Sequence, residues 1–178
     1  MPAPTLPPLE RTDAKLRELG ALDVAANPLA HALETTLGRG KARQVLSGSW
    51  LGHPLHAALV GLPIGSFIGA TVLDITSPKA SERAARRLVG LGIVSALPAV
   101  LAGLSDWSTM EAGPARRVGL VHAATMDVAT VLGLKSWRMR GRGHHVGAAA
   151  VSALSLGFVG FGAWLGGQLA YDDSPSIA

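Results

Sequence analysis

The sequence predicts an all-α integral membrane protein, in which an antiparallel four-helix bundle follows an amphipathic helical segment. Four hydrophobic segments are long enough to cross a bilayer, because roughly 20 helical residues span an apolar layer of about 30 Å. Apolar residues make up 48% of the 178 residues and charged residues only 16%, which is low for a soluble domain. The 22 glycines are typical of helices that pack backbone to backbone in lipid.

Residues 1–52 form the predicted amphipathic or interfacial segment. From Leu9 to Val24, leucines alternate with charged residues at helical spacing, and this pattern predicts a first helix that ends near Asn27–Pro28. A second helical pattern runs from Leu29 to Leu46. Either helix would lie on the membrane surface or fold over the bundle.

Residues 53–172 form the predicted membrane domain, and residues 173–178 form an acidic tail. Pro54 suits the first turn of a helix, while Pro63 and Pro98 are expected to kink the helices that contain them. The short connections between the segments predict antiparallel neighbours. The expected helices cover residues 54–76, 84–105, 118–134 and 146–171, the third being the shortest.

Glycines recur at every fourth position in two of these segments, at Gly61, Gly65 and Gly69 and again at Gly162 and Gly166. Such small-residue grooves allow close approach of helices in lipid and predict packing faces. A homo-oligomer that assembles through these grooves is therefore one expected partnership.

Basic residues cluster beside the hydrophobic segments, which indicates topology and lipid headgroups as the reason for the net charge of +4. No basic surface with stacking aromatic residues is evident, so the sequence argues against nucleic-acid binding. The loops after the first and third segments are the most basic, and this distribution favours both termini outside the cytoplasm.

Polar side chains converge at one end of the predicted bundle. His56 begins the first helix and His122 lies near the start of the third, which runs in the same direction. The second helix ends there with Asp106 and Trp107, and the fourth with Gln168. Ionisable residues within membrane segments are costly and suggest function.

Three interpretations of these residues remain open. Haem b could bind between His56 and His122, because imidazole is a haem ligand and helical bundles house cofactors in their cores. A transition metal ion could bind His53, His56 and His122 together with Asp106; a quinone headgroup is a related possibility. Alternatively, the histidines form hydrogen bonds between helices and bind nothing.

Two aspartates lie within the predicted spans. Asp74, near the far end of the first helix, is expected to pair with a cation from the adjoining loop, and Asp127 lies near the middle of the third. No nucleophile–base pair or substrate pocket is evident, so the sequence leans against an enzyme. The absence of cysteine excludes disulfides and cysteine-bound iron–sulfur clusters.

The chain also resembles a known bacterial membrane family, domain-of-unknown-function family 2231. The resemblance covers about residues 45–172 and rests on Gly52-His53-Pro54-Leu55-His56, Leu62-Pro63-Ile64-Gly65, Leu73-Asp74, Gly103-Leu104-Ser105-Asp106-Trp107, Arg116-Arg117-Val118-Gly119-Leu120-Val121-His122-Ala123, Ser136-Trp137-Arg138 and Gly166-Gly167-Gln168-Leu169. This chain has Ala57 where the family usually has proline, and Met126 where it usually has asparagine.

The resemblance implies a four-helix domain in the bacterial cytoplasmic membrane, often fused to or encoded beside a Rieske iron–sulfur domain. That association implies redox chemistry, with a Rieske or other redox protein as partner. We therefore expect a membrane-embedded electron-transfer subunit that binds haem b through His56 and His122, with Asp106 and Trp107 at the rim and Gln168 near the ligands. The alternative is a structural anchor or docking partner without a cofactor of its own.

Overall fold

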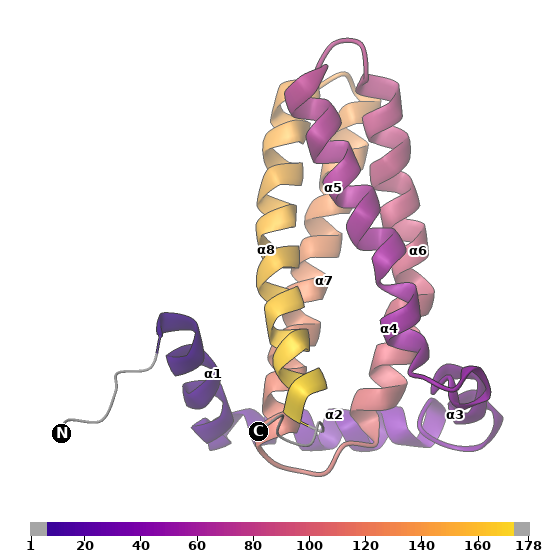
Figure 1. Cartoon of the computed structure of the whole chain (residues 1–178), viewed down its shortest axis with the longest axis vertical. Coiled ribbons are helices and arrows are strands. Elements are labelled where there is room, and N and C mark those ends of the chain that lie inside the picture. Colours follow the sequence, from indigo (N-terminus) through magenta and orange to yellow (C-terminus); the bar gives the residue numbers. More distant parts are fainter. Residues whose placement is uncertain (1–6, 173–178) are drawn as a thin grey trace.

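The computed structural model describes residues 7–172, and these residues form α-helices, short 3-10 turns and connecting loops. Four long rods stand side by side: α4 and α5 (Leu55–Leu59 and Gly61–Thr76), α6 (Glu82–Ser108), α7 (Pro114–Gly141) and α8 (His145–Asp172). They alternate in direction, as Figure 1 shows, with the α5–α6 and α7–α8 connections at the upper end. All four are long and apolar enough to cross a membrane, so the predicted all-α membrane architecture is confirmed.

The first rod is divided at Val60, where α4 ends and α5 begins. Pro63 follows three residues later and has no N–H to donate to the carbonyl of Leu59, which weakens the helix at this point. The chain nevertheless continues in one direction, and Leu55–Thr76 acts as a single candidate span. In contrast, α6 runs through Pro98 as one helix.

The third rod differs most from the expected range of 118–134, because α7 begins at Pro114 and ends at Gly141. Pro114 occupies the opening turn, where its missing N–H costs nothing. At the other end, the basic residues after Leu134 continue the helix, and Arg140 turns inward with only 3% exposure. His122 therefore lies more than two turns inside the helix, deeper than expected.

The N-terminal helices lie across the lower end of the bundle in Figure 1: α1 (Pro8–Glu18), α2 (Asp23–Thr36) and α3 (Gly40–Leu46). The expected break at Asn27–Pro28 is wrong, since α2 runs through Pro28 and the chain turns at Gly20–Leu22 instead. Pro28 falls early in α2 and deprives only the carbonyl of Val24, a strongly exposed residue, of its donor.

The second expected N-terminal helix, Leu29–Leu46, is likewise interrupted at its centre. A Cβ at Gly38 would come within 2.8 Å of the Ser108 hydroxyl, so only glycine lets the chain pass this close to the end of α6. Gly40 then takes a positive φ of 58°, which glycine tolerates best. The hydroxyl of Ser105 donates to the carbonyl of Leu37 at 2.8 Å and fixes the bend.

The bundle interior consists mainly of small residues, with Phe67 as its largest central side chain. A Cβ at Gly133 of α7 would lie 2.8 Å from the Phe67 ring of α5. Because glycine has no Cβ, α7 can pack directly against this ring. The predicted groove on α8 is filled from within the chain, because Met126 packs at Gly162 and His122 at Gly166. On the first rod, positions 61 and 65 face open space.

Candidate functional site

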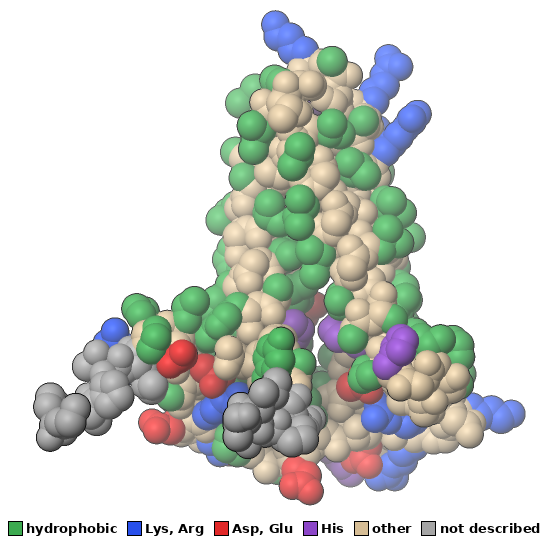
Figure 2. Space-filling model, in the orientation of Figure 1, with side chains coloured by type: hydrophobic (Ala, Val, Ile, Leu, Met, Phe, Trp, Pro, Cys, Tyr) green, Lys and Arg blue, Asp and Glu red, His purple; other side chains and the backbone are tan. Residues whose placement is uncertain are grey.

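Two histidines meet near the lower end of the bundle. His56 lies on α4 and His122 on α7, and their ring centroids are 6.2 Å apart with an angle of 83° between the ring planes. Both side chains are half-buried. Figure 2 shows histidine side chains on both walls of an opening in the lower half of the bundle, between the sides formed by α8 and α4. The expected juxtaposition of the two imidazoles is therefore present.

Each ring is held by one hydrogen bond to a helix backbone. The Nδ1 of His56 lies 2.8 Å from the carbonyl oxygen of Ala99 on α6, and the Nδ1 of His122 lies 2.8 Å from that of Gly162 on α8. A carbonyl oxygen only accepts, so both Nδ1 atoms carry the proton and donate it. Among the residues described, neither Nε2 has a hydrogen-bond partner.

This pattern is the one by which proteins orient histidine ligands. A ligating imidazole commonly donates its second N–H to a carbonyl or carboxylate, which fixes the tautomer and leaves the other nitrogen basic. Here the two backbone carbonyls play that role from α6 and α8. The pair therefore presents two unprotonated Nε2 atoms in the neutral state.

Glycines make room for both rings. A Cβ at Gly103 of α6 would lie 2.8 Å from the Nδ1 of His56, and one at Gly166 of α8 would lie 3.1 Å from the Cε1 of His122. A side chain at position 103 would force the His56 ring to move, and one at position 166 would crowd the His122 ring more mildly. The sequence pattern predicts Gly166 only as a packing position, and nothing in it marks Gly103 as the neighbour of a histidine.

The two rings are close enough for their nitrogens to be considered as one donor pair, with centroids 6.2 Å apart. His56 and His122 would hold a haem or a metal ion at this place, because imidazole nitrogen is a ligand for both. A further protein ligand is not at hand, because no three His, Asp or Glu residues in the described part of the chain are grouped for metal binding.

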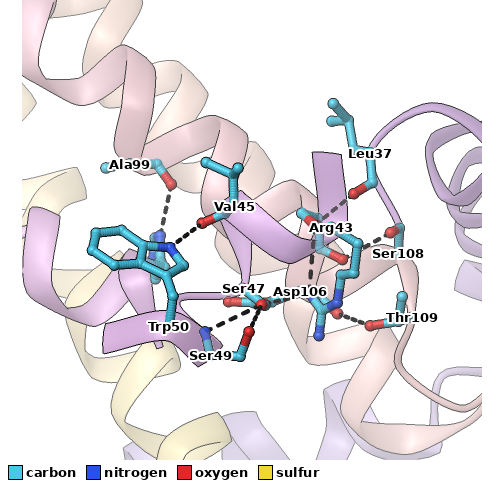
Figure 3. A network of polar contacts seen from close by, with 12 residues as sticks. Leu37, Arg43, Val45, Ser47, Ser49, Trp50, Ala99, Asp106, Ser108 and Thr109 are labelled. Atoms are coloured by element: carbon cyan, nitrogen blue, oxygen red, sulfur yellow. Dashed lines mark hydrogen bonds and ion pairs between the residues drawn. The ribbon is translucent and has the colours of Figure 1, made fainter. Parts of the chain in front are cut away.

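Asp106 and Trp107 lie at the end of α6, where they connect the lower end of the bundle to the N-terminal helices. The carboxylate of Asp106 accepts from Arg43 of α3 at 2.5 Å. Figure 3 shows this pair beside the hydrogen bonds that close the α3 turn, including Trp50 to the carbonyl of Val45 at 2.9 Å. Asp106 is therefore already neutralised by a neighbour.

Trp107 is buried and packs with Ala26 and Ala30 of α2. Its indole N–H donates to the carbonyl of Arg116 at 2.9 Å, and its ring fills the space beside Gly119, where a Cβ would lie 2.4 Å away. These contacts tie α6 to α2 and α7. The structure thus gives Trp107 a packing role at the base.

Gln168 and His53 complete the expected set. Gln168 is half-buried on α8, and its side chain makes no hydrogen bond within the described residues. His53 is exposed in the turn before α4. The structure therefore brings together His56 and His122 but does not join His53 or Asp106 to them as a metal-ligand cluster.

A second ion pair at the lower end of the bundle, between Arg117 and Asp23, was not evident in the sequence. Arg117 of α7 donates through both Nε and Nη2 to the carboxylate of Asp23 on α2, at 2.8 and 2.6 Å. This guanidinium lowers the pKa of the Asp23 carboxyl below its ordinary value, and Arg116 adds to the effect. This pairing cannot be predicted from the sequence, because the two residues are separated by 94 positions.

The comparisons with known proteins agree with this architecture. The family model described as predicted membrane protein (DUF2231) matches residues 52–176, which include the whole bundle and both histidines. No curated protein matches the chain, and no solved structure does. With the match covering most of its length, the chain belongs to the DUF2231 family of predicted membrane proteins.

Proposed function

We propose that this protein is a membrane-embedded electron-transfer subunit that holds haem b between His56 and His122. The observation that carries the proposal is the state of the two rings: each is fixed through Nδ1, while its Nε2 has no partner among residues 7–172. A bound haem would supply one-electron exchange, with a potential that depends on its axial ligands and surroundings.

The chain's own residues would tune and protect such a site. The carbonyls of Ala99 and Gly162 orient the imidazoles and raise their basicity through the hydrogen bonds from Nδ1. The small, apolar residues of the bundle interior would lower the polarity on one side of such a group. Gln168, half-buried near the same end of α8, is a candidate for an additional polar contact.

The charge distribution supports an orientation with the upper end of the bundle in the bacterial cytoplasm. Basic side chains gather at that end in Figure 2, and exposed cations there include Lys79, Arg83, Arg86, Arg87, Lys135, Arg138 and Arg142. At the lower end, the basic residues of the N-terminal helices are accompanied by acidic ones. Short cytoplasmic loops are enriched in Lys and Arg, so both termini and the histidine pair would lie toward the outer face.

Haem content of the purified protein tests the proposal. The full chain is expressed in haem-replete cells, purified in detergent and assayed as the pyridine haemochrome, with metal content measured in parallel. We expect one haem per chain in the parent protein and almost none in His56→Ala or His122→Ala. His53→Ala is the matched control, because it removes an exposed histidine three residues away and should retain haem.

Two outcomes would overturn the proposal. One is a parent protein that is monodisperse, folded and colourless; the other is full haem content in both His56→Ala and His122→Ala. A stoichiometric transition metal without porphyrin would instead identify the histidine pair as part of a bare metal site. In that case the electron-transfer assignment would lose its cofactor.

A docking role without a cofactor is the second candidate. The N-terminal helices form a platform across the lower end of the bundle (Figure 1), and four membrane spans would anchor it beside a Rieske or other redox protein. The open face at Gly61 and Gly65 offers a surface for a second helix or a second copy. Under this alternative, Gly65→Leu disrupts assembly, whereas the two histidine variants leave it intact.

A further inference from the structure

A basic hollow lies at the upper end of the bundle, between α6 and α7 and far along both helices from the histidine pair. Three arginines of α6 and one aromatic residue of α7 line it: Arg83, Arg86, Arg87 and Trp137. Its volume is about 400 Å³. The arginines occupy positions i, i+3 and i+4, so they share one side of the helix.

The hollow has a preorganised centre. The guanidinium carbon of Arg86 lies 4.7 Å from the centroid of the Trp137 ring, which is a cation–π contact. A Cβ at Gly141 would lie 2.9 Å from this guanidinium, and a Cβ at Gly90 would lie 3.0 Å from the Trp137 Nε1. Two glycines therefore leave room for the stacked pair, and the planar guanidinium is held with its donors available.

The positive charge of the hollow has no ion-pair partner in the part of the chain that the structure describes. Among the described residues, no carboxylate forms an ion pair with Arg83, Arg86 or Arg87. Glu82, the adjacent acidic residue, instead contacts His145 at 3.1 Å. Three neighbouring cations without a counterion favour an anionic ligand.

The surface next to the hollow is apolar. Leu91 and Val94 follow Arg87 at helical spacing on α6 and are 45% and 64% exposed. They belong to the same candidate membrane span as the arginines. A ligand with a charged phosphate and a hydrocarbon chain would match both features, whereas inorganic phosphate would use only the first.

We propose that this hollow binds the phosphate group of an anionic phospholipid at the cytoplasmic surface, with the acyl chains along α6. Arg83 and Arg87 contact the phosphate as charged donors, and the guanidinium fixed on Trp137 gives the site its shape. Basic pockets between membrane helices recognise lipid headgroups through this combination of charge and enclosure. The inference is independent of whether the histidine pair binds haem.

Lipid titration followed by native mass spectrometry tests the site. The full chain in neutral detergent is titrated separately with phosphatidylglycerol and phosphatidylcholine, with and without an excess of inorganic phosphate. We expect saturable binding of phosphatidylglycerol, at least tenfold tighter than that of phosphatidylcholine, and little competition by inorganic phosphate. Replacing all three arginines, in Arg83→Gln/Arg86→Gln/Arg87→Gln, should weaken phosphatidylglycerol binding more than tenfold, because it removes every cation that lines the hollow.

The control variant, Lys135→Gln/Arg138→Gln/Arg142→Gln, removes the same charge from the same end of the bundle without touching the hollow and should retain binding. Arg86→Lys keeps the charge but loses the planar stack on Trp137, so we expect an intermediate loss. An equal loss in the two triple variants would overturn the proposal, since it would mean diffuse attraction rather than a site. Equal binding of both lipids, or displacement by inorganic phosphate, would also overturn it.

Discussion

At the upper end of the bundle Asp74 and Arg140 pair with each other, whereas at the lower end His56 and His122 each bond through only one ring nitrogen within residues 7–172. The Asp74 carboxylate accepts from both terminal nitrogens of Arg140 at 2.8 and 2.5 Å. Ser136 and Ser152 accept from the same guanidinium at 3.3 and 3.2 Å. The histidines, in contrast, each have one hydrogen bond to a carbonyl.

The difference separates a structural polar cluster from one that can bind a ligand. A buried ion pair whose charged groups bond to each other and to neighbouring hydroxyls holds helices together and leaves little capacity for a further ligand. A pair of imidazoles with two free nitrogens keeps that capacity, and the glycines beside them preserve the space. Polar residues in membrane spans should therefore be judged by the bonds that they leave unmade as well as by their position.

The largest effect should come from breaking the polar cluster at the upper end of the bundle, here called the upper cluster, which consists of Asp74, Arg140, Ser136 and Ser152. Asp74→Ala leaves the buried Arg140 cation without its partner, and such a loss costs about 3–5 kcal/mol. Thermal unfolding in detergent should show a marked drop in midpoint for Asp74→Ala or Arg140→Ala alone. The double variant should be less destabilised than the sum of the two, because no unpaired charge then remains.

The control for this cluster is Arg138→Ala, which removes an exposed cation two residues before Arg140. A substitution at an exposed site away from such features changes stability by less than about 0.5 kcal/mol. If Asp74→Ala lowered the midpoint of thermal unfolding no more than Arg138→Ala does, the ion pair between Asp74 and Arg140 would not stabilise the bundle.

A medium effect is expected where glycine accommodates a histidine. Gly103→Ala places a Cβ 2.8 Å from the His56 Nδ1, and overpacking of this kind costs about 1–3 kcal/mol. The helix gains about 1 kcal/mol from replacing glycine by alanine, so a net loss of about 1 kcal/mol should remain. We also expect a displaced ring and a reduced haem content.

Gly157→Ala of α8 is the matched control, since a Cβ there meets nothing within 4 Å. It should be neutral or stabilising in the same thermal assay and should leave the haem content unchanged. A Gly103→Ala variant that behaves identically would show that His56 is not confined by α6.

The smallest effect concerns the attachment of the N-terminal platform at low pH. The hydrogen bonds from Arg117 lower the pKa of Asp23 in the folded state. The stability that this pair contributes is therefore complete above the ordinary carboxyl pKa. It is lost as the pH falls through the lowered value. Hydrogen exchange of α2 should therefore increase only in strongly acidic buffer. The Asp23→Asn variant should show the faster exchange already at neutral pH. Equal exchange of α2 in the parent protein and the variant at neutral pH would contradict the role of the Asp23–Arg117 pair.

Long-range periodicity allowed the bundle and its antiparallel order to be predicted from the sequence, because four apolar segments leave few alternatives. The ends of α7 were not predictable in this way. Arg140 looks like a loop residue until Asp74 is seen opposite it, and that partner lies 66 positions away. Likewise, the turn at Gly38 depends on the Ser108 hydroxyl of another helix.

The histidine pair could be anticipated because His56 and His122 lie on parallel rods near the same end. Their hydrogen bonds to Ala99 and Gly162 could not, since backbone carbonyls leave no trace in a sequence. Asp106 was expected at the rim of the site, yet Arg43 engages it from α3. The sequence thus identified the residues that meet, and the structure supplied which of their atoms are already used.

The absorption spectrum of the purified, full-length protein tests most directly whether the Nε2 atoms of His56 and His122 form a cofactor site. In detergent, the protein should show a Soret band that shifts on reduction with dithionite, and this band should be lost in His56→Ala and in His122→Ala. A folded protein from haem-replete cells without such absorption would contradict the account.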